Sequence, residues 1–394
     1  MAFLDKLTTA FGSTFQESML NIIRVETMVD DRTLVLKDGS LMSMIRVEGA
    51  LRQPGVAELS AMVDRFRQLL MPYFSQTGHA LEINFCRDPE AARTHLERLV
   101  NRSKRNARAL DMDLDDVLDE RVENLSKKMV SETCLISVYT YAAVLMPEER
   151  KTDMATRAKR LAGIPPVRRG QVPGKELDSM FTRHGEFVEA VHTGLETIGQ
   201  MAGILSVKET LQEMRAALYP ETYPYKNEWQ PRMPLWSSEA KKEGERSNIV
   251  MMPDNVAEMN AMDASNLTVE TFDRQLATRD SLVDTVRSVR IGDTLFQGFD
   301  LSVAPETLPE FNSLVSDISA KDMGTPWRAS MRIEAGGVQA MALKMLYLSI
   351  MSWSAPIYNG RIRDALMINQ HADGDGTAIV KFRMSFCTWD IRGN

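Results

Sequence analysis

Cysteine and histidine are both scarce in this chain of 394 residues, and their spacing excludes two kinds of site. The three cysteines, Cys86, Cys134 and Cys387, form no CxxC or CxH pair, and each lies in an apolar run where a free thiol behaves as a small hydrophobe. The five histidines form no HxxxH or HExxH spacing. The sequence therefore predicts neither a disulfide framework nor a local metal centre, and it fits a reducing compartment.

Long hydrophobic runs are also missing. The longest apolar stretch covers residues 338–353 and is interrupted by Gln339 and Lys344, whereas a transmembrane helix needs about 20 apolar residues. The first residues lack the basic region and the apolar core of a signal peptide. We therefore expect a soluble cytoplasmic protein. Its formal charge of −7 argues against a general nucleic-acid binder, since such proteins carry a basic excess.

The motifs of a nucleotide-hydrolysing site are absent as well. A phosphate loop needs GxxxxGK followed by Ser or Thr, directly after a strand. The nearest match runs from Gly170 to Glu176, but it is one residue short and ends in a glutamate where a hydroxyl would hold magnesium. No GxSxG nucleophile elbow is present, although composition alone leaves a Ser-His-Asp triad open. We therefore predict no catalytic residue, no cofactor and no metal ligand in this chain.

What the chain does have is the length for two compact units, because a single hydrophobic core stops growing at about 250–300 residues. Alternating and helical apolar patterns predict an α+β fold, with antiparallel or mixed sheets on which helices pack. Similar strand-helix-strand patterns at both ends predict two α/β halves that bracket a helical insertion. The predicted divisions are an amphipathic segment at 1–24, an α/β subdomain at 25–145, a helical insertion at 146–220, a proline-rich aromatic connector at 221–246 and a second α/β subdomain at 247–394.

The clearest local signal is a β-hairpin around Asp38-Gly39, because glycine tolerates the positive φ of a tight turn. One helix is expected to begin after Pro54-Gly55 and to end at Pro72, and another to begin with Asp88 as its cap. The stretch 147–218 has a helical pattern, and the 280s favour mixed helical structure. Further predicted strands cover residues 80–86, 134–141, 249–252, 295–303, 328–334 and 377–387, and further helices cover 89–110, 113–130, 305–319, 337–353 and 357–369.

Charge is segregated along two consecutive predicted helices. Residues 93–108 carry six basic side chains and one acidic, and residues 111–123 carry seven acidic and one basic. Such blocks can be solvated faces that partly pair with each other, a docking surface for a protein, or a contact with nucleic acid. No aromatic residues interleave with the arginines to form a stacking platform for bases. The candidate interface residues on these helices are Arg98, Arg102, Arg105, Arg108, Asp113, Asp116 and Asp119.

A second candidate interface is the amphipathic segment near the N-terminus. Phe3, Leu7, Phe11 and Phe15 recur at helical spacing, which is typical of segments that bind membrane proteins or lipid headgroups. We expect this segment to attach the chain to the cytoplasmic face of a membrane.

Several runs give this sequence a resemblance to a known family. They are residues 33–49 around the Asp38-Gly39 turn, Gln76 to Phe85, Asp113 to Val122, Ile164-Pro165-Pro166 and Trp229-Gln230-Pro231. With these runs the chain resembles the N-terminal half of the DotO/IcmB/TraU family of type IV secretion and conjugation ATPases, from about residue 25 to residue 389.

The resemblance implies a non-catalytic role. In that family a motor domain that binds ATP and magnesium follows this region, so the resemblance implies a chain that is part of a longer protein or has lost its motor. It also implies dimers or higher oligomers attached to inner-membrane components of a secretion channel, at the cytoplasmic face of the bacterial inner membrane. We therefore predict an assembly and docking domain. The alternative is a nucleic-acid-binding module that contacts transferred single-stranded DNA.

Overall fold

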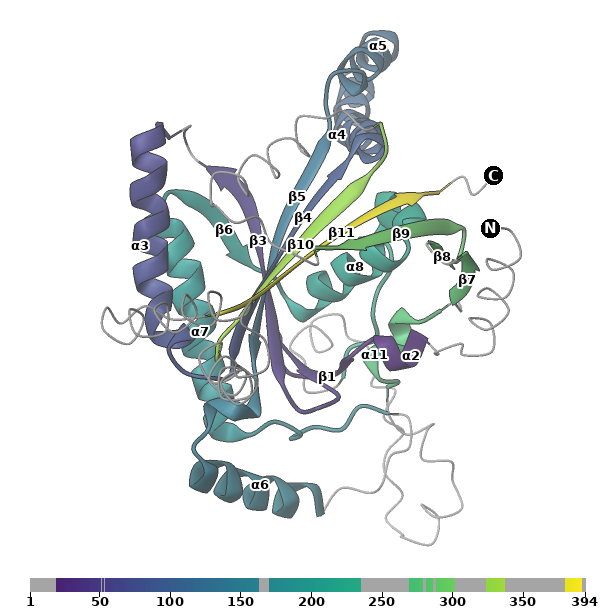
Figure 1. Cartoon of the computed structure of the whole chain (residues 1–394). Coiled ribbons are helices and arrows are strands. Elements are labelled where there is room, and N and C mark those ends of the chain that lie inside the picture. The colour runs from purple at the N-terminus through teal and green to yellow at the C-terminus, as the bar shows by residue number, and fades with distance from the viewer. Residues whose placement is uncertain are drawn as a thin grey trace, which may run out of the picture.

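The computed structural model describes residues 19–50, 52, 54–162, 170–234, 269–278, 281–285, 288–301, 324–336 and 380–391. Within these ranges it has one large β-sheet with helices on both of its faces (Figure 1). The α+β class that the sequence predicts is confirmed.

All the described strands belong to this eleven-stranded sheet, and their pairings are antiparallel. The strand order is β1-β2-β3-β5-β4-β10-β11-β9-β8-β7, and β6 pairs with β3 outside that path. The strands are β1 Val25–Asp30, β2 Thr33–Leu36, β3 Leu41–Ala50, β4 His79–Asp88, β5 Ser131–Thr140, β6 Gln200–Ile204, β7 Ser281–Thr285, β8 Ser288–Ile291, β9 Thr294–Asp300, β10 Trp327–Glu334 and β11 Lys381–Asp390.

Strands from an early and a late part of the chain pair in the middle of the sheet. β10 lies antiparallel to β4 from the pair Trp327–Arg87 to the pair Glu334–Ala80. On its other side β10 pairs with β11 along its whole length. The strands of the first α/β stretch and those of the last therefore form one continuous sheet.

Along the chain, α2 precedes β1 and the other described helices lie between strands. They are α2 Met19–Ile22, α3 Val56–Phe74, α4 Pro89–Ala109, α5 Asp115–Ser126, α6 Pro147–Ala162, α7 Asp178–Thr197, α8 Val207–Leu218 and α11 Phe272–Leu276, with the 3₁₀ helices η1 Ala142–Val144 and η2 Pro220–Tyr225.

Hydrophobic cores lie on both faces of the sheet, because successive side chains of a strand point to opposite sides. On β3, Ile45 belongs to the core that α3 and α7 complete, whereas Met42 and Met44 belong to the core that α2, α8 and α11 complete. In Figure 1, α3 and α7 lie on one side of the twisted sheet and α8 on the other. The helices thus pack against the sheet as two layers.

Two local predictions are confirmed in detail. β2 and β3 form the expected hairpin, in which Gly39 has a φ of +81° and the Asp38 carboxylate accepts a hydrogen bond from the Ser40 N–H at 3.0 Å. At the start of α4, the Asp88 Oδ1 accepts the Ala91 N–H at 3.0 Å and so caps the helix.

The prediction that Pro72 ends its helix is wrong. α3 continues to Phe74, and the Ser75 N–H still bonds to the Met71 carbonyl at 3.0 Å. Proline in the last turn removes one N–H donor, but Phe74 and Leu70 are buried in the core against α7. Burial of these side chains therefore holds the last turn in helical form.

The sequence also fails to predict four strands, the first of which, β1, precedes the expected hairpin. β6 lies inside the stretch expected to be helical, and β7 and β8 form an antiparallel pair where the 280s favour mixed helical structure. β6 pairs with β3, which lies far earlier in the chain. Tertiary pairing therefore overrides the local pattern at these positions.

Several predicted elements lie outside the described residues. They are the strand at 249–252, the helices at 305–319, 337–353 and 357–369, and the N-terminal amphipathic segment.

Candidate functional site

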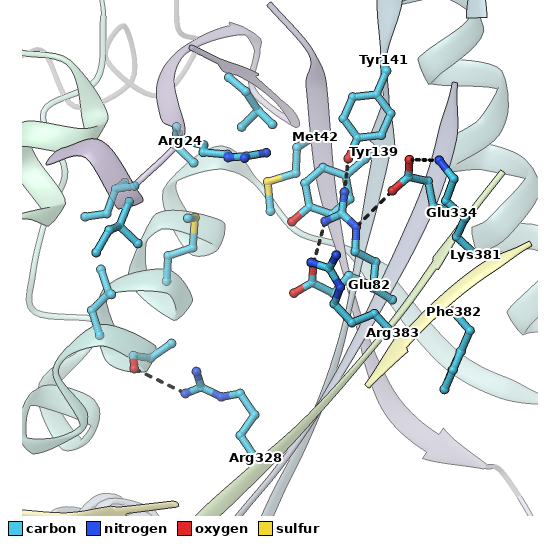
Figure 2. Close-up of a pocket in the computed structure, with 18 residues that line it drawn as sticks. Arg24, Met42, Glu82, Tyr139, Tyr141, Arg328, Glu334, Lys381, Phe382 and Arg383 are labelled. Carbon is cyan, nitrogen blue, oxygen red and sulfur yellow. Dashed lines mark hydrogen bonds and ion pairs between the residues drawn. The ribbon is translucent and has the colours of Figure 1, made fainter. Parts of the chain in front are cut away.

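A cleft of about 670 Å³ lies on the face of the sheet that carries α8 (Figure 2). This volume is within the range of small-molecule sites, roughly 300–1,000 Å³. One wall consists of charged and aromatic side chains from β4, β5, β10 and β11. The facing wall, from α2, β1, β2 and α8, is mostly apolar. The cleft therefore has a polar side and an apolar side.

The polar wall results from the period-two alternation of its strands. On β10 the alternate residues Ala329, Met331 and Ile333 lie on the opposite face of the sheet. Towards the cleft, β10 carries Arg328, Ser330, Arg332 and Glu334, and β11 carries Lys381 and Arg383 in register with the last two. Since α8 covers only part of this face, the rest of the polar row is left to line the cleft.

Arg332 is held from several directions. Its Nη1 donates to Glu82 Oε2 at 3.1 Å, its Nη2 donates to the Tyr141 hydroxyl, and its Nε is 3.8 Å from Glu334 Oε2. The guanidinium carbon also lies 5.0 Å from the centre of the Tyr139 ring. These four contacts fix the position of the guanidinium in the cleft.

The two tyrosines support this arginine and do not supply a base. Their rings are stacked, with centroids 6.3 Å apart and planes 3° apart. Burial raises the pKa of Tyr139 far above its usual range, with the nearby Glu82 carboxylate adding to the effect, and burial also raises the pKa of Tyr141. Both hydroxyls are therefore neutral at neutral pH.

The cleft carries an excess of positive charge. Arg383 is the direct cross-strand neighbour of Arg332. Arg24 lines the cleft from the other wall, between α2 and β1. Neither Arg24 nor Arg383 forms an ion pair with any described residue. The lining has five cationic side chains, Arg24, Arg328, Arg332, Lys381 and Arg383, and two carboxylates, Glu82 and Glu334, so its formal charge is 5 − 2 = +3.

The cleft continues into a smaller lobe of about 210 Å³ between the same sheet face and α8. Here the buried Glu213 carboxylate lies 2.6 Å from both Arg46 Nη2 and Lys226 Nζ. Cys86 also lines this lobe, and burial raises the pKa of its thiol to about 11. The thiol is therefore protonated at neutral pH and is not an activated nucleophile.

A Ser-His pair is present but cannot work as a nucleophile and its base. The Ser43 Oγ donates its proton to the Arg32 carbonyl at 2.8 Å, so it must accept from His184 Nε2 at 3.0 Å. His184 Nδ1 then accepts from the Thr140 hydroxyl at 2.9 Å. The imidazole thus donates to the serine, and the pair is completely buried. This network is a structural part of the core.

The nearest match to a phosphate loop has another use in the fold. Gly170 forms an isolated β-bridge with Glu270, and the Lys175 ammonium pairs with Glu26. The lysine that a phosphate loop would aim at a nucleotide is thus bound to a carboxylate of β1.

The predicted interface residues of the charged helices lie on one helical hairpin, α4 and α5, which we call the arm. The arm extends beyond one end of the sheet (Figure 1). Arg102, Arg105 and Arg108 on α4, Asp113 in the turn, and Asp116 and Asp119 on α5 are all exposed. Arg98 is also on α4, but its side chain is outside the described part of the structure, as are the predicted Phe3, Leu7, Phe11 and Phe15.

The two charge blocks pair in part within the arm. Lys104 Nζ lies 2.7 Å from Asp119 Oδ2, and Arg108 pairs with Asp115. Arg102, Arg105 and Asp116 form no ion pair with another described residue. Internal pairing therefore leaves charges of both signs available on the arm.

The described residues contain no group of three or more His, Cys, Asp or Glu side chains placed to hold a metal ion. Among the same residues, no helix combines the length and apolar character needed to cross a membrane.

No protein-family model matches the chain, and no curated protein sequence matches it.

The residues of the cleft were not predicted from the sequence. They come from α2, α8 and strands that are distant along the chain, and no short motif connects them. The available signal was the alternation of basic and apolar residues on β10, which indicates a strand with one polar face.

Proposed function

We propose that this chain is a non-catalytic assembly module that associates with a second copy of itself through the arm. The observation that carries the proposal is the charge left on the arm after internal pairing. Arg102 and Arg105 on α4 and Asp116 on α5 are exposed, and they form no ion pair with another described residue. A surface with unpaired charges of both signs on neighbouring helices is complementary to itself. In a twofold contact, a basic residue of one copy can face an acidic residue of the other, and the same pair then forms a second time with the copies exchanged. Such a surface therefore suits a second copy of the same chain.

Exposed apolar side chains on the arm support the same proposal. Leu99, Leu110 and Val117 are 59%, 73% and 63% exposed. Protein interfaces typically place apolar side chains at the centre and polar ones at the rim. α4 has 21 residues and is therefore about 30 Å long, which gives the arm a long side on which to pair.

The setting we propose follows from the sequence resemblance to the DotO/IcmB/TraU family. In that setting the arm fixes the geometry of protomers in a secretion or conjugation motor, and the N-terminal amphipathic segment attaches the assembly peripherally to the inner membrane. An in-frame GxxxxGK[ST] downstream of Asn394 in the encoding gene would support this parentage.

Light scattering after size exclusion tests self-association directly. The wild-type chain is expected to run as a dimer or larger. The charge-reversal variant R102E/R105E is expected to have a lower mass in solution, because the two introduced carboxylates would be repelled by the acidic side chains of the second copy's arm. The matched control is R150E/K159E on α6, which makes the same change of charge on another exposed helix and should leave the mass unchanged.

A monomeric wild-type chain at micromolar concentration would contradict the proposal, and so would an R102E/R105E variant of unchanged mass. Oligonucleotide binding that weakens steeply with salt would favour the nucleic-acid alternative instead.

A further inference from the structure

We propose that the cleft binds a phosphate monoester with an apolar or aromatic body. The phosphate binds beside Arg383 of the polar wall, with Arg24 of the facing wall as a second cationic ligand, and the apolar side chains of the facing wall take the rest of the molecule. This inference does not depend on self-association through the arm, because the cleft and the arm share no residue.

The first argument is the position of Arg383. It lies directly opposite Arg332 on the neighbouring strand, and like charges in directly opposed positions destabilise a sheet. The Glu82 and Glu334 carboxylates contact Arg332, but no described carboxylate pairs with Arg383. A bound anion beside Arg383 would remove this repulsion.

The second argument is the amount of charge. The lining has a formal charge of +3, so a single carboxylate ligand would leave most of the excess in place. A phosphate monoester carries a charge of about −1.5 to −2 at neutral pH and offers three acceptor oxygens. Guanidinium groups match such oxygens in pairs, which suits Arg24 and Arg383 as the direct ligands.

The third argument is the facing wall. Ile22, Val25 and Leu218 are among its apolar side chains, and Ile22 is 55% exposed although it borders the cleft. Inorganic phosphate would leave this wall in contact with water. A ligand with an apolar body would cover it, and burying apolar area stabilises a complex by about 25 cal/mol per Å².

Isothermal titration with paired probes tests the inference. Adenosine 5′-monophosphate represents a soluble source of the phosphate, and a single-chain lysophosphatidic acid represents a lipid headgroup. Each is compared with its uncharged counterpart, adenosine or a monoacylglycerol. At least one phosphate probe should bind, and it should bind at least about tenfold more tightly than its neutral counterpart. The probe that binds then identifies the source.

Two single variants test the assigned ligands. Arg24→Met and Arg383→Met should each weaken binding of the phosphate probe by about 10- to 100-fold, the usual effect of losing a hydrogen bond to a charged group. Both side chains are exposed and form no ion pair with a described residue, so neither change should lower the melting temperature. Arg383→Met should raise it slightly, because the repulsion from Arg332 is removed. The control Arg105→Met, on the arm, should bind as the wild type does.

Equal binding of charged and neutral probes would overturn the inference, as would full affinity in both cleft variants. The R102E/R105E arm variant should retain probe binding, so failure of self-association and failure of the cleft proposal are distinguishable.

Discussion

Acidification should destabilise this fold through two buried histidines. His184 is fully buried between Ser43 and Thr140, and burial lowers its pKa to about 3. His79 is also buried, and burial lowers its pKa to about 4. Its Nδ1 lies 3.1 Å from the Tyr73 carbonyl oxygen, and the Arg183 cation also disfavours its protonation.

Because both pKa values are lowered by folding, acidification lowers the free energy of unfolding. In the unfolded chain both histidines have a pKa near 6.5, so below that pH the unfolded state binds protons that the folded state excludes. The stabilisation is therefore complete above about pH 6.5 and is lost as the pH falls towards 4 and then 3. At pH 5 each histidine should cost the fold about 2 kcal/mol relative to pH 8, and the pair about 4 kcal/mol.

Urea denaturation followed by circular dichroism at pH 8, 7, 6 and 5 measures this loss. Carboxylates contribute to the same curve, so the wild type is compared with His184→Gln, whose amide can bond to Ser43 and Thr140 but does not titrate. The drop in unfolding free energy between pH 8 and pH 5 should be smaller by about 2 kcal/mol in the variant. An identical drop in both proteins would show that His184 takes up no proton on unfolding, and the argument from burial would then be refuted.

The other predictions concern one buried carboxylate and one glycine. Glu213→Ala should cost about 3–5 kcal/mol by urea denaturation, because it leaves Arg46 and Lys226 unpaired in a largely buried cluster; Glu123→Ala, in an exposed pair with Lys127, should show no measurable loss. Gly78→Ala should cost about 3 kcal/mol or more, since φ is +112° and a Cβ would lie 2.4 Å from the Val144 backbone nitrogen. Gly185→Ala inside α7, where a Cβ would meet nothing within 4 Å, should instead stabilise by up to about 1 kcal/mol. Equal losses within either pair of variants would contradict the reasoning.

Local features of this fold could be predicted because their causes are local. The Asp38-Gly39 turn needs only a residue that accepts positive φ, and the start of α4 needs only a carboxylate that reaches the Ala91 N–H. Most long strands also follow from alternation, as at β4 and β10. The internal pairing of Lys104 with Asp119 was one of the alternatives that the opposed charge blocks left open.

Strand pairing could not be predicted in the same way. β6 has five residues, and Gly203, the fourth of them, has a low strand propensity. The strand therefore depends on the hydrogen bonds that β3 provides. α3 passes Pro72 for a similar reason, since burial of Phe74 outweighs the missing donor. In both places a contact distant in sequence decides the local conformation.

The cleft is the strongest example, because each of its charged residues has an ordinary explanation when taken alone. Arg328 and Arg332 at alternate positions of β10 read as the solvent face of a strand, and so do Lys381 and Arg383 near the start of β11. Only the pairing of β10 with both β4 and β11 places Arg383 beside Arg332 and Arg332 beside Glu82. A carboxylate opposite Arg383 on β10 would have given a simple salt bridge across the strands, whereas the sequence places Arg332 there. The unmatched charge is therefore a property of the register, and this is why we interpret it as a binding feature of the folded chain.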